Sequence, residues 1–136
     1  MSAVPSNAVS VELEVPFHDV DALRVVWHGH YYKYFEIART QLFRARGLDQ
    51  DAFVALGLTV VVIDTQCRHA SPLRYADRFR VDAWFRDIEH RMCVAYQIQN
   101  LSSGRRAARG RTVLVTIDST GGMLLQTPEV IRARLA

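Results

Sequence analysis

The 136-residue sequence predicts one α+β domain, in which an antiparallel sheet of about five strands wraps around one long helix. Three observations support this prediction. A long helical pattern of apolar residues lies near the N-terminus, several segments of alternating apolar and polar residues follow it, and no linker or repeat interrupts them. A helix with so much apolar surface has to be covered by a sheet. The domain is expected to span residues 11–136, after a flexible tail at residues 1–10.

Five segments are predicted as strands. Residues 11–17 alternate apolar side chains with two glutamates, which is typical of a strand with one buried face. The β-branched run at residues 58–63 is typical of a central strand. Alternating patterns at residues 78–86 and 92–98 predict a long hairpin, and residues 111–118 form a further strand rich in Thr and Val. One edge strand of such a sheet is available to pair with a second subunit.

Helices are predicted in three places. The long helix follows from apolar residues that recur at steps of four and three: Tyr31, Phe35, Ala38, Leu42 and Ala45. Gly47 is expected to end it. Residues 49–56 are expected to form a short helix capped by Asp49, and Thr127 is expected to cap a terminal helix that begins at Pro128.

Composition restricts the class of protein. With 49% hydrophobic and 23% charged residues, the chain has the balance of a soluble globular protein. No apolar run approaches the roughly 18 residues of a membrane span, and the N-terminus lacks the pattern of a signal peptide, so a cytoplasmic protein is expected. Cys67 and Cys93 lie outside any metal-binding spacing and are expected to be reduced, partly buried thiols.

The net charge of +3 does not predict a nucleic-acid-binding protein, because the basic residues are spread along the chain. The densest basic group lies beside a predicted hairpin turn: Arg105, Arg106, Arg109 and Arg111. Mild basicity of this kind suits a phosphate-bearing small ligand or an acidic carrier protein.

Residues 17–36 are the most informative stretch, because two carboxylates and two histidines directly precede the predicted long helix. No Ser, Thr, Asp or Asn occupies residues 28–30, so the first backbone N–H groups of the helix are expected to lack a side-chain acceptor. Free N–H groups at the positive end of a helix dipole are suited to bind an anion or a developing oxyanion. We therefore predict a reaction site at this stretch.

The same residues resemble a family motif. Hotdog-fold thioesterases of the 4-hydroxybenzoyl-CoA and acyl-CoA thioesterase type are similar in the segments Asp19-Val-Asp21, Val25-Val-Trp-His28, Tyr31 and Phe35-Glu-x-Ala-Arg39. The order of helix and strands resembles that fold from residue 11 onward, and residues 27–34 look closest to thioesterases of aryl-polyene pigment and fatty-acyl pathways. The resemblance implies hydrolysis of an acyl-CoA or acyl-carrier-protein thioester. It also implies a homo-oligomer, dimer or tetramer, with the site at a subunit interface and with no cofactor or metal.

Carried over to this sequence, the resemblance assigns the catalytic carboxylate to Asp21 and the oxyanion-binding backbone N–H to His28. Asp21 acts either as the general base toward water or as the nucleophile at the acyl carbon, and the sequence leaves both roles open. Where many relatives have a small or glycine-bearing pair, this chain has Leu23-Arg24. The residues expected to contact the substrate are Trp27, Gly29, Tyr31 and Arg24.

Two alternative functions stay open. One is a hotdog dehydratase acting on a hydroxyacyl thioester, in which His28 would pair with an acid. The other is a non-catalytic module that binds an acyl group or a carrier protein. Asp19 is expected to stabilise the loop rather than to react. A metal site is disfavoured because His28 and His30 would diverge on a helix.

Overall fold

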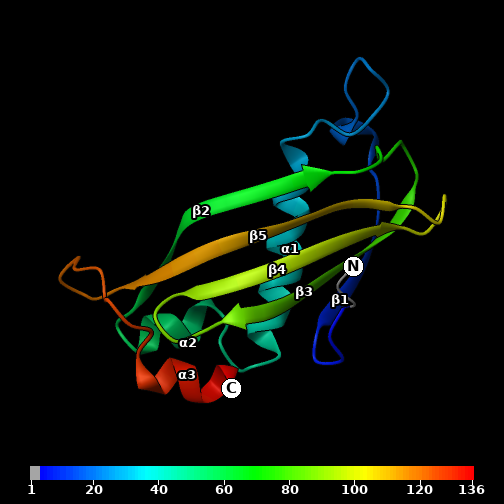
Figure 1. Ribbon diagram of the computed structural model, residues 1–136. Helices are drawn as coiled ribbons and strands as arrows, with labels where there is room; N and C mark the ends of the chain where they lie inside the picture. Colours follow the sequence, from blue (N-terminus) through cyan, green and yellow to red (C-terminus); the bar gives the residue numbers. More distant parts are fainter. Residues whose placement is uncertain (1–3) are drawn as a thin grey trace.

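Residues 4–136 are described by the computed structural model, and in this part of the chain five antiparallel strands form one sheet across a long helix (Figure 1). The strands are β1 (Val9–Glu14), β2 (Thr59–His69), β3 (Arg78–Asp87), β4 (Met92–Asn100) and β5 (Arg106–Ile117). The helices are the 3₁₀ turn η1 (Phe17–Asp19), α1 (His30–Arg44), α2 (Gln50–Ala55) and α3 (Glu129–Leu135). The strand order is β1-β3-β4-β5-β2, so β1 and β2 are the edges. The predicted α+β architecture is confirmed.

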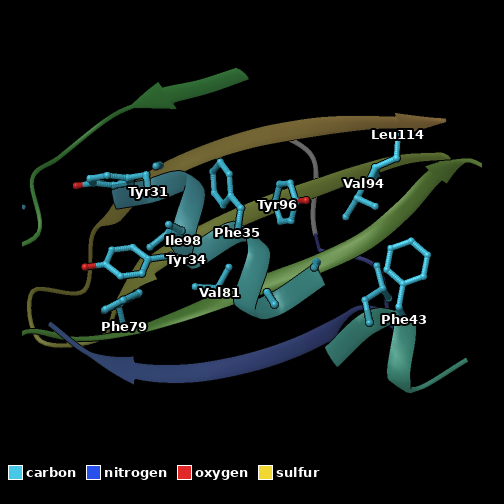
Figure 2. Packing of buried hydrophobic residues seen from close by; sticks show 14 of the residues in the cluster. Tyr31, Tyr34, Phe35, Phe43, Phe79, Val81, Val94, Tyr96, Ile98 and Leu114 are labelled. Atoms are coloured by element: carbon cyan, nitrogen blue, oxygen red, sulfur yellow. The ribbon is translucent and has the colours of Figure 1, made fainter. Parts of the chain in front are cut away.

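Helix α1 packs one face against the sheet, and its buried residues are Tyr31, Tyr34, Phe35, Ala38, Leu42 and Phe43. The Phe35 ring stacks on Tyr96 of β4, with centroids 4.3 Å apart and planes 7° from parallel (Figure 2). The predicted apolar face is confirmed except at Ala45, which is exposed because α1 ends at Arg44 and Ala45 is its C-cap. Gly47 follows with φ +69°, a left-handed conformation that suits glycine after a helix.

Gly110 of β5 is the position where Phe35 comes closest to the sheet. A Cβ at Gly110 would lie 2.6 Å from the Phe35 ring and would overlap the Gln66 carbonyl of β2. Gly110→Ala is therefore expected to lower the free energy of unfolding by about 1–3 kcal/mol, because the ring or the strand must move. Urea denaturation measures this, with Gly122→Ala in an exposed turn as the control. Equal stability of the two variants would contradict the packing.

Strand β2 lies at an edge of the sheet, so the central position predicted for residues 58–63 is wrong. It pairs with β5 from Thr59 to His69, and within residues 4–136 nothing covers its other side. Val61, Val62 and Ile63 are 39%, 42% and 45% exposed. An apolar β-branched run identifies a strand but not its place in the sheet, which depends on pairing with distant segments.

Other boundaries shift by a few residues. β1 begins at Val9, so the last two residues of the predicted tail belong to a strand, whereas residues 1–3 lie outside the described part. β5 begins at Arg106 rather than at residue 111, because pairing with β4 extends it. The N-cap of α3 is Pro128, not Thr127. The Asp49 cap is confirmed, since its carboxylate accepts the Gln50 N–H at 2.8 Å.

Both cysteines are free and half-buried, as predicted, and burial raises the pKa of Cys67 to about 11. Among the helices of residues 4–136, none is long and apolar enough to cross a membrane.

Candidate active site

Residues 17–29 form a loop between β1 and α1, called here the motif loop, and backbone hydrogen bonds fold it back on itself. The Asp21 N–H donates to the Val25 carbonyl at 3.0 Å, and the Trp27 N–H donates to the Asp19 carbonyl at 3.1 Å. The Val26 N–H donates to the Leu73 carbonyl at 2.8 Å, which ties the loop to the segment after β2. The motif loop is therefore a short ladder with Asp21 near its tip and His28 at its base.

Asp19 anchors the motif loop to α1. Its side chain is 1% exposed and accepts hydrogen bonds from Lys33 Nζ at 2.6 Å and from the Tyr34 hydroxyl at 2.5 Å. Burial on its own raises the pKa of Asp19, but the hydrogen bonds from Lys33 and Tyr34 outweigh it and hold the pKa below its ordinary value. Asp19 is thus a buried carboxylate that connects the loop to the first turn of the helix, in line with the stabilising role expected for it.

Asp21 lies at the tip of the ladder and is partly exposed. Its Oδ1 accepts the Leu23 N–H at 2.8 Å, and its carbonyl accepts the Arg24 N–H at 2.9 Å. This is the turn that a loop aspartate commonly makes with its own backbone. In the described part of the chain Oδ2 accepts no hydrogen bond, so one carboxylate oxygen is available to a ligand.

Arg24 adopts the left-handed backbone conformation, with φ +65°. A side chain there costs roughly 1–2 kcal/mol, which glycine avoids. The Leu23-Arg24 pair therefore keeps a turn suited to glycine and places an exposed arginine three residues after Asp21.

Arg24→Gly is expected to be more stable than Arg24→Ala by about 1 kcal/mol, because both variants lose the side chain and only glycine relieves the backbone. Thermal or urea unfolding of the two proteins measures the difference. A less stable glycine variant would show that the left-handed turn does not form in solution.

The start of α1 differs slightly from the prediction. The helix begins at His30 with Gly29 as N-cap, so His28 lies in a turn before the helix rather than in its first turn. The predicted lack of a side-chain cap is confirmed. Within residues 4–136, the backbone N–H groups of His28 and Gly29 donate to no acceptor. Two N–H groups therefore remain free at the positive end of α1.

Aromatic side chains surround this turn. Trp27 is 48% exposed, and its ring packs against the rings of His28 and His30, with centroids 5.2 Å and 5.3 Å away. A side chain at Gly29 would collide with the Trp27 ring, so the glycine allows this packing. Tyr31, in contrast, is 2% exposed, and its hydroxyl accepts the Leu73 N–H at 3.2 Å. In the single chain, Tyr31 therefore exposes almost no surface to the substrate that it was predicted to contact.

His69 is a residue of this site that the sequence did not reveal. It ends β2, and its ring packs edge-on against Tyr31 at 4.5 Å and lies 6.4 Å from the ring of His28. Burial, followed by the nearby His28, lowers the pKa of His69, which favours the neutral imidazole. Alternation along β2 places the His69 side chain on the same face of the sheet as Cys67. This is the only feature of the neighbouring sequence that indicates where the side chain points. Within residues 4–136, no group of three His, Cys, Asp or Glu side chains is arranged to hold a metal ion.

Comparison with known proteins identifies the family. Residues 15–135 match the model of the thioesterase-like superfamily, and the chain belongs to this superfamily. A relative from Aquifex aeolicus named "Putative esterase" is 37% identical over 67 residues, which are 49% of this chain and 52% of the relative. The match therefore spans about half the length of that relative. A Synechocystis protein named "Putative esterase" is 28% identical over 137 residues, which cover 99% of this chain and 82% of the length of that protein.

The fold is that of solved thioesterases. The 1,4-dihydroxy-2-naphthoyl-CoA thioesterase from Synechocystis superposes with a TM-score of 0.84 at 19% identity, covering 94% of this chain and 95% of its own. The predicted hotdog fold is confirmed, and so is the predicted thioesterase family. The narrower likeness to aryl-polyene thioesterases stays a prediction.

Proposed function

We propose that the chain hydrolyses an acyl-CoA or acyl-carrier-protein thioester to a carboxylic acid and a thiol at the motif loop. The observation that carries the proposal is the pair of free N–H groups on His28 and Gly29 at the uncapped start of α1. Asp21 and these two N–H groups belong to the same motif loop, in which backbone hydrogen bonds join Asp21 to Val25 and Trp27 to Asp19. A thioester carbonyl is proposed to bind between the Asp21 carboxylate and these N–H groups.

In the proposed reaction, Asp21 takes a proton from a water molecule whose oxygen attacks the acyl carbon. The carbonyl oxygen becomes an oxyanion and accepts hydrogen bonds from the His28 and Gly29 N–H groups. Collapse of the tetrahedral intermediate breaks the C–S bond and releases the thiolate. Alternatively, Asp21 attacks the acyl carbon itself, and water hydrolyses the resulting anhydride. We assign substrate contact to Trp27 and Arg24, which are exposed residues of the motif loop.

A panel of acyl-CoA and acyl-carrier-protein thioesters, assayed by release of free thiol, tests the proposal. Turnover of at least one thioester supports it and identifies the carrier. Binding without turnover on any thioester would favour the acyl-binding module. Formation of an enoyl thioester from a hydroxyacyl thioester, followed by its absorbance, would favour the dehydratase. We also propose a cytoplasmic location, for which the two free thiols are typical.

We further propose that a second copy of the chain pairs along β2. This edge strand has 11 residues and exposes three consecutive apolar side chains at Val61, Val62 and Ile63. A long apolar edge is a template for another strand, and natural proteins rarely leave one uncovered. The pairing produces a dimer, and two dimers produce the tetramer also implied by the resemblance.

Val62→Lys is expected to shift the protein toward the monomer, because it places a charge on the edge that we propose is covered. Sedimentation velocity measures the shift. Val130→Lys on α3 is the matched control, since Val130 is 43% exposed and Val62 is 42% exposed. A parent protein that sediments as a monomer would refute the pairing. If Val62→Lys and Val130→Lys dissociate the protein equally, the subunit interface does not lie specifically along β2.

A further inference from the structure

A hollow of about 810 Å³ lies over strands β2 to β5, and its lining includes five arginines and no Asp or Glu. Most of its lining belongs to the face of the sheet opposite α1, which lies in front of α1 in Figure 1, and Tyr32 of α1 also lines it. The five residues, called here the arginine hollow, are Arg68, Arg86, Arg106, Arg109 and Arg111. Trp84 and Gln97 also line it. Arg106, Arg109 and Arg111 belong to the basic group that the sequence places beside a hairpin turn. Strand pairing brings Arg68 and Arg86 next to them.

The register of the strands places like charges opposite one another. Arg68 of β2 pairs directly with Arg109 of β5, next to the pair Cys67 and Gly110. Cys67 and Gly110 face the core, so Arg68 and Arg109 point together to the other face. Arg111 lies two residues along β5 and shares that face. Like charges directly opposite across strands are destabilising, so this arrangement costs stability in the free protein.

Within residues 4–136, none of the five arginines of the hollow forms an ion pair. Arg80 on the same face differs, since its Nε lies 3.0 Å from the Asp82 carboxylate. Asp64 and Asp87 lie near Cys93, at the end of the hollow that also holds Arg86 and Arg111. The uncompensated positive charge is therefore concentrated at the other end, around Arg68, Arg106 and Arg109.

We propose that the arginine hollow binds an organic polyphosphate of nucleotide type. A guanidinium presents paired N–H donors that match phosphate oxygens, and three or more of them compensate a diphosphate. The volume lies in the range of small-molecule sites, and Trp84 offers an aromatic ring to a nucleobase. The ligand has two sources: the nucleotide end of a CoA thioester, which rests on the proposed function, or a free nucleotide.

The site is distinct from the motif loop in a single chain. Arg68 and His69 are neighbours on β2, so their side chains point to opposite faces of the sheet. The ring of His69 faces the start of α1, whereas Arg68 faces the hollow. A symmetric second copy on this face would place the same arginines against one another, which disfavours self-association there.

Isothermal titration of the full chain with ADP and with pyrophosphate tests binding without any turnover. The parent protein is expected to bind both probes, and the double variant Arg68→Ala/Arg109→Ala is expected to bind them at least tenfold more weakly. Arg44→Ala is the control, because Arg44 ends α1 on the other side of the sheet and pairs with Asp49. The proposal is overturned if the parent binds neither probe at millimolar concentration. It is also overturned if the control loses as much affinity, or if the double variant changes the oligomeric state.

Kinetics then separate the two sources. If the CoA nucleotide is the ligand, the double variant raises KM for an acyl-CoA at least tenfold and leaves KM for the matching acyl-pantetheine unchanged. If a free nucleotide is the ligand, both KM values stay at the parent level although ADP binding is lost. Because titration does not depend on catalysis, a protein that binds ADP but hydrolyses no thioester would refute the proposed function and retain the polyphosphate site.

Discussion

Asp21→Asn is expected to lower kcat/KM for the best thioester substrate at least about 100-fold, equivalent to ~2.7 kcal/mol of barrier. The amide neither accepts a proton from water nor attacks an acyl carbon, whereas its oxygen still accepts the Leu23 N–H that shapes the turn. The fold and assembly are therefore expected to be unchanged. Thiol release measures the rate, and circular dichroism with sedimentation checks the structure.

Asp51→Asn on α2 is the matched control for Asp21, because it makes the same change at an exposed aspartate away from the motif loop. It should keep the parent rate. If Asp21→Asn also retains full turnover, Asp21 has no part in the mechanism, and the reacting group has to be sought among the neighbours of the free N–H groups, with His69 the first to examine.

Asp19→Asn is expected to lower the free energy of unfolding by about 2–3 kcal/mol, because hydrogen bonds to a buried charged group are stronger than neutral ones. The variant leaves Lys33 without its carboxylate and exchanges a charged acceptor for a neutral one at Tyr34. Since this contact connects the motif loop to α1, turnover is expected to fall with stability. Urea unfolding at neutral pH measures the loss.

The pH dependence tests the same contact. The pKa of Asp19 is lower in the folded protein than its ordinary value of 3.8, so its stabilisation is fully present above pH 3.8 and is lost as the pH falls through the folded pKa. The stability difference between parent and variant should therefore shrink below about pH 4. Glu36→Gln is the control, since Glu36 is 70% exposed and is expected to change stability by less than about 1 kcal/mol. A constant difference down to low pH would contradict an ionised Asp19.

Much of the site is local in origin and was therefore predictable. The absence of a capping side chain at residues 28–30 is a property of three consecutive residues, and the uncapped start of α1 follows from it. The turn at Asp21 also depends on its own neighbours. The boundary at His30 differs from the prediction because hydrogen bonds from His30 and Tyr31 to Trp27 and His28 form a turn before the helix.

The sequence by itself determined the elements whose patterns are local: the buried face of α1, the β3–β4 hairpin, the Asp49 cap and the free N–H groups at His28 and Gly29. Only the tertiary structure decided that β2 lies at an edge, that His69 reaches the start of α1, and that Arg68 faces Arg109. The physical reason is the range of the interactions. Helix periodicity and capping act within a few residues, whereas strand order and register are set by hydrogen bonds between segments far apart in the chain.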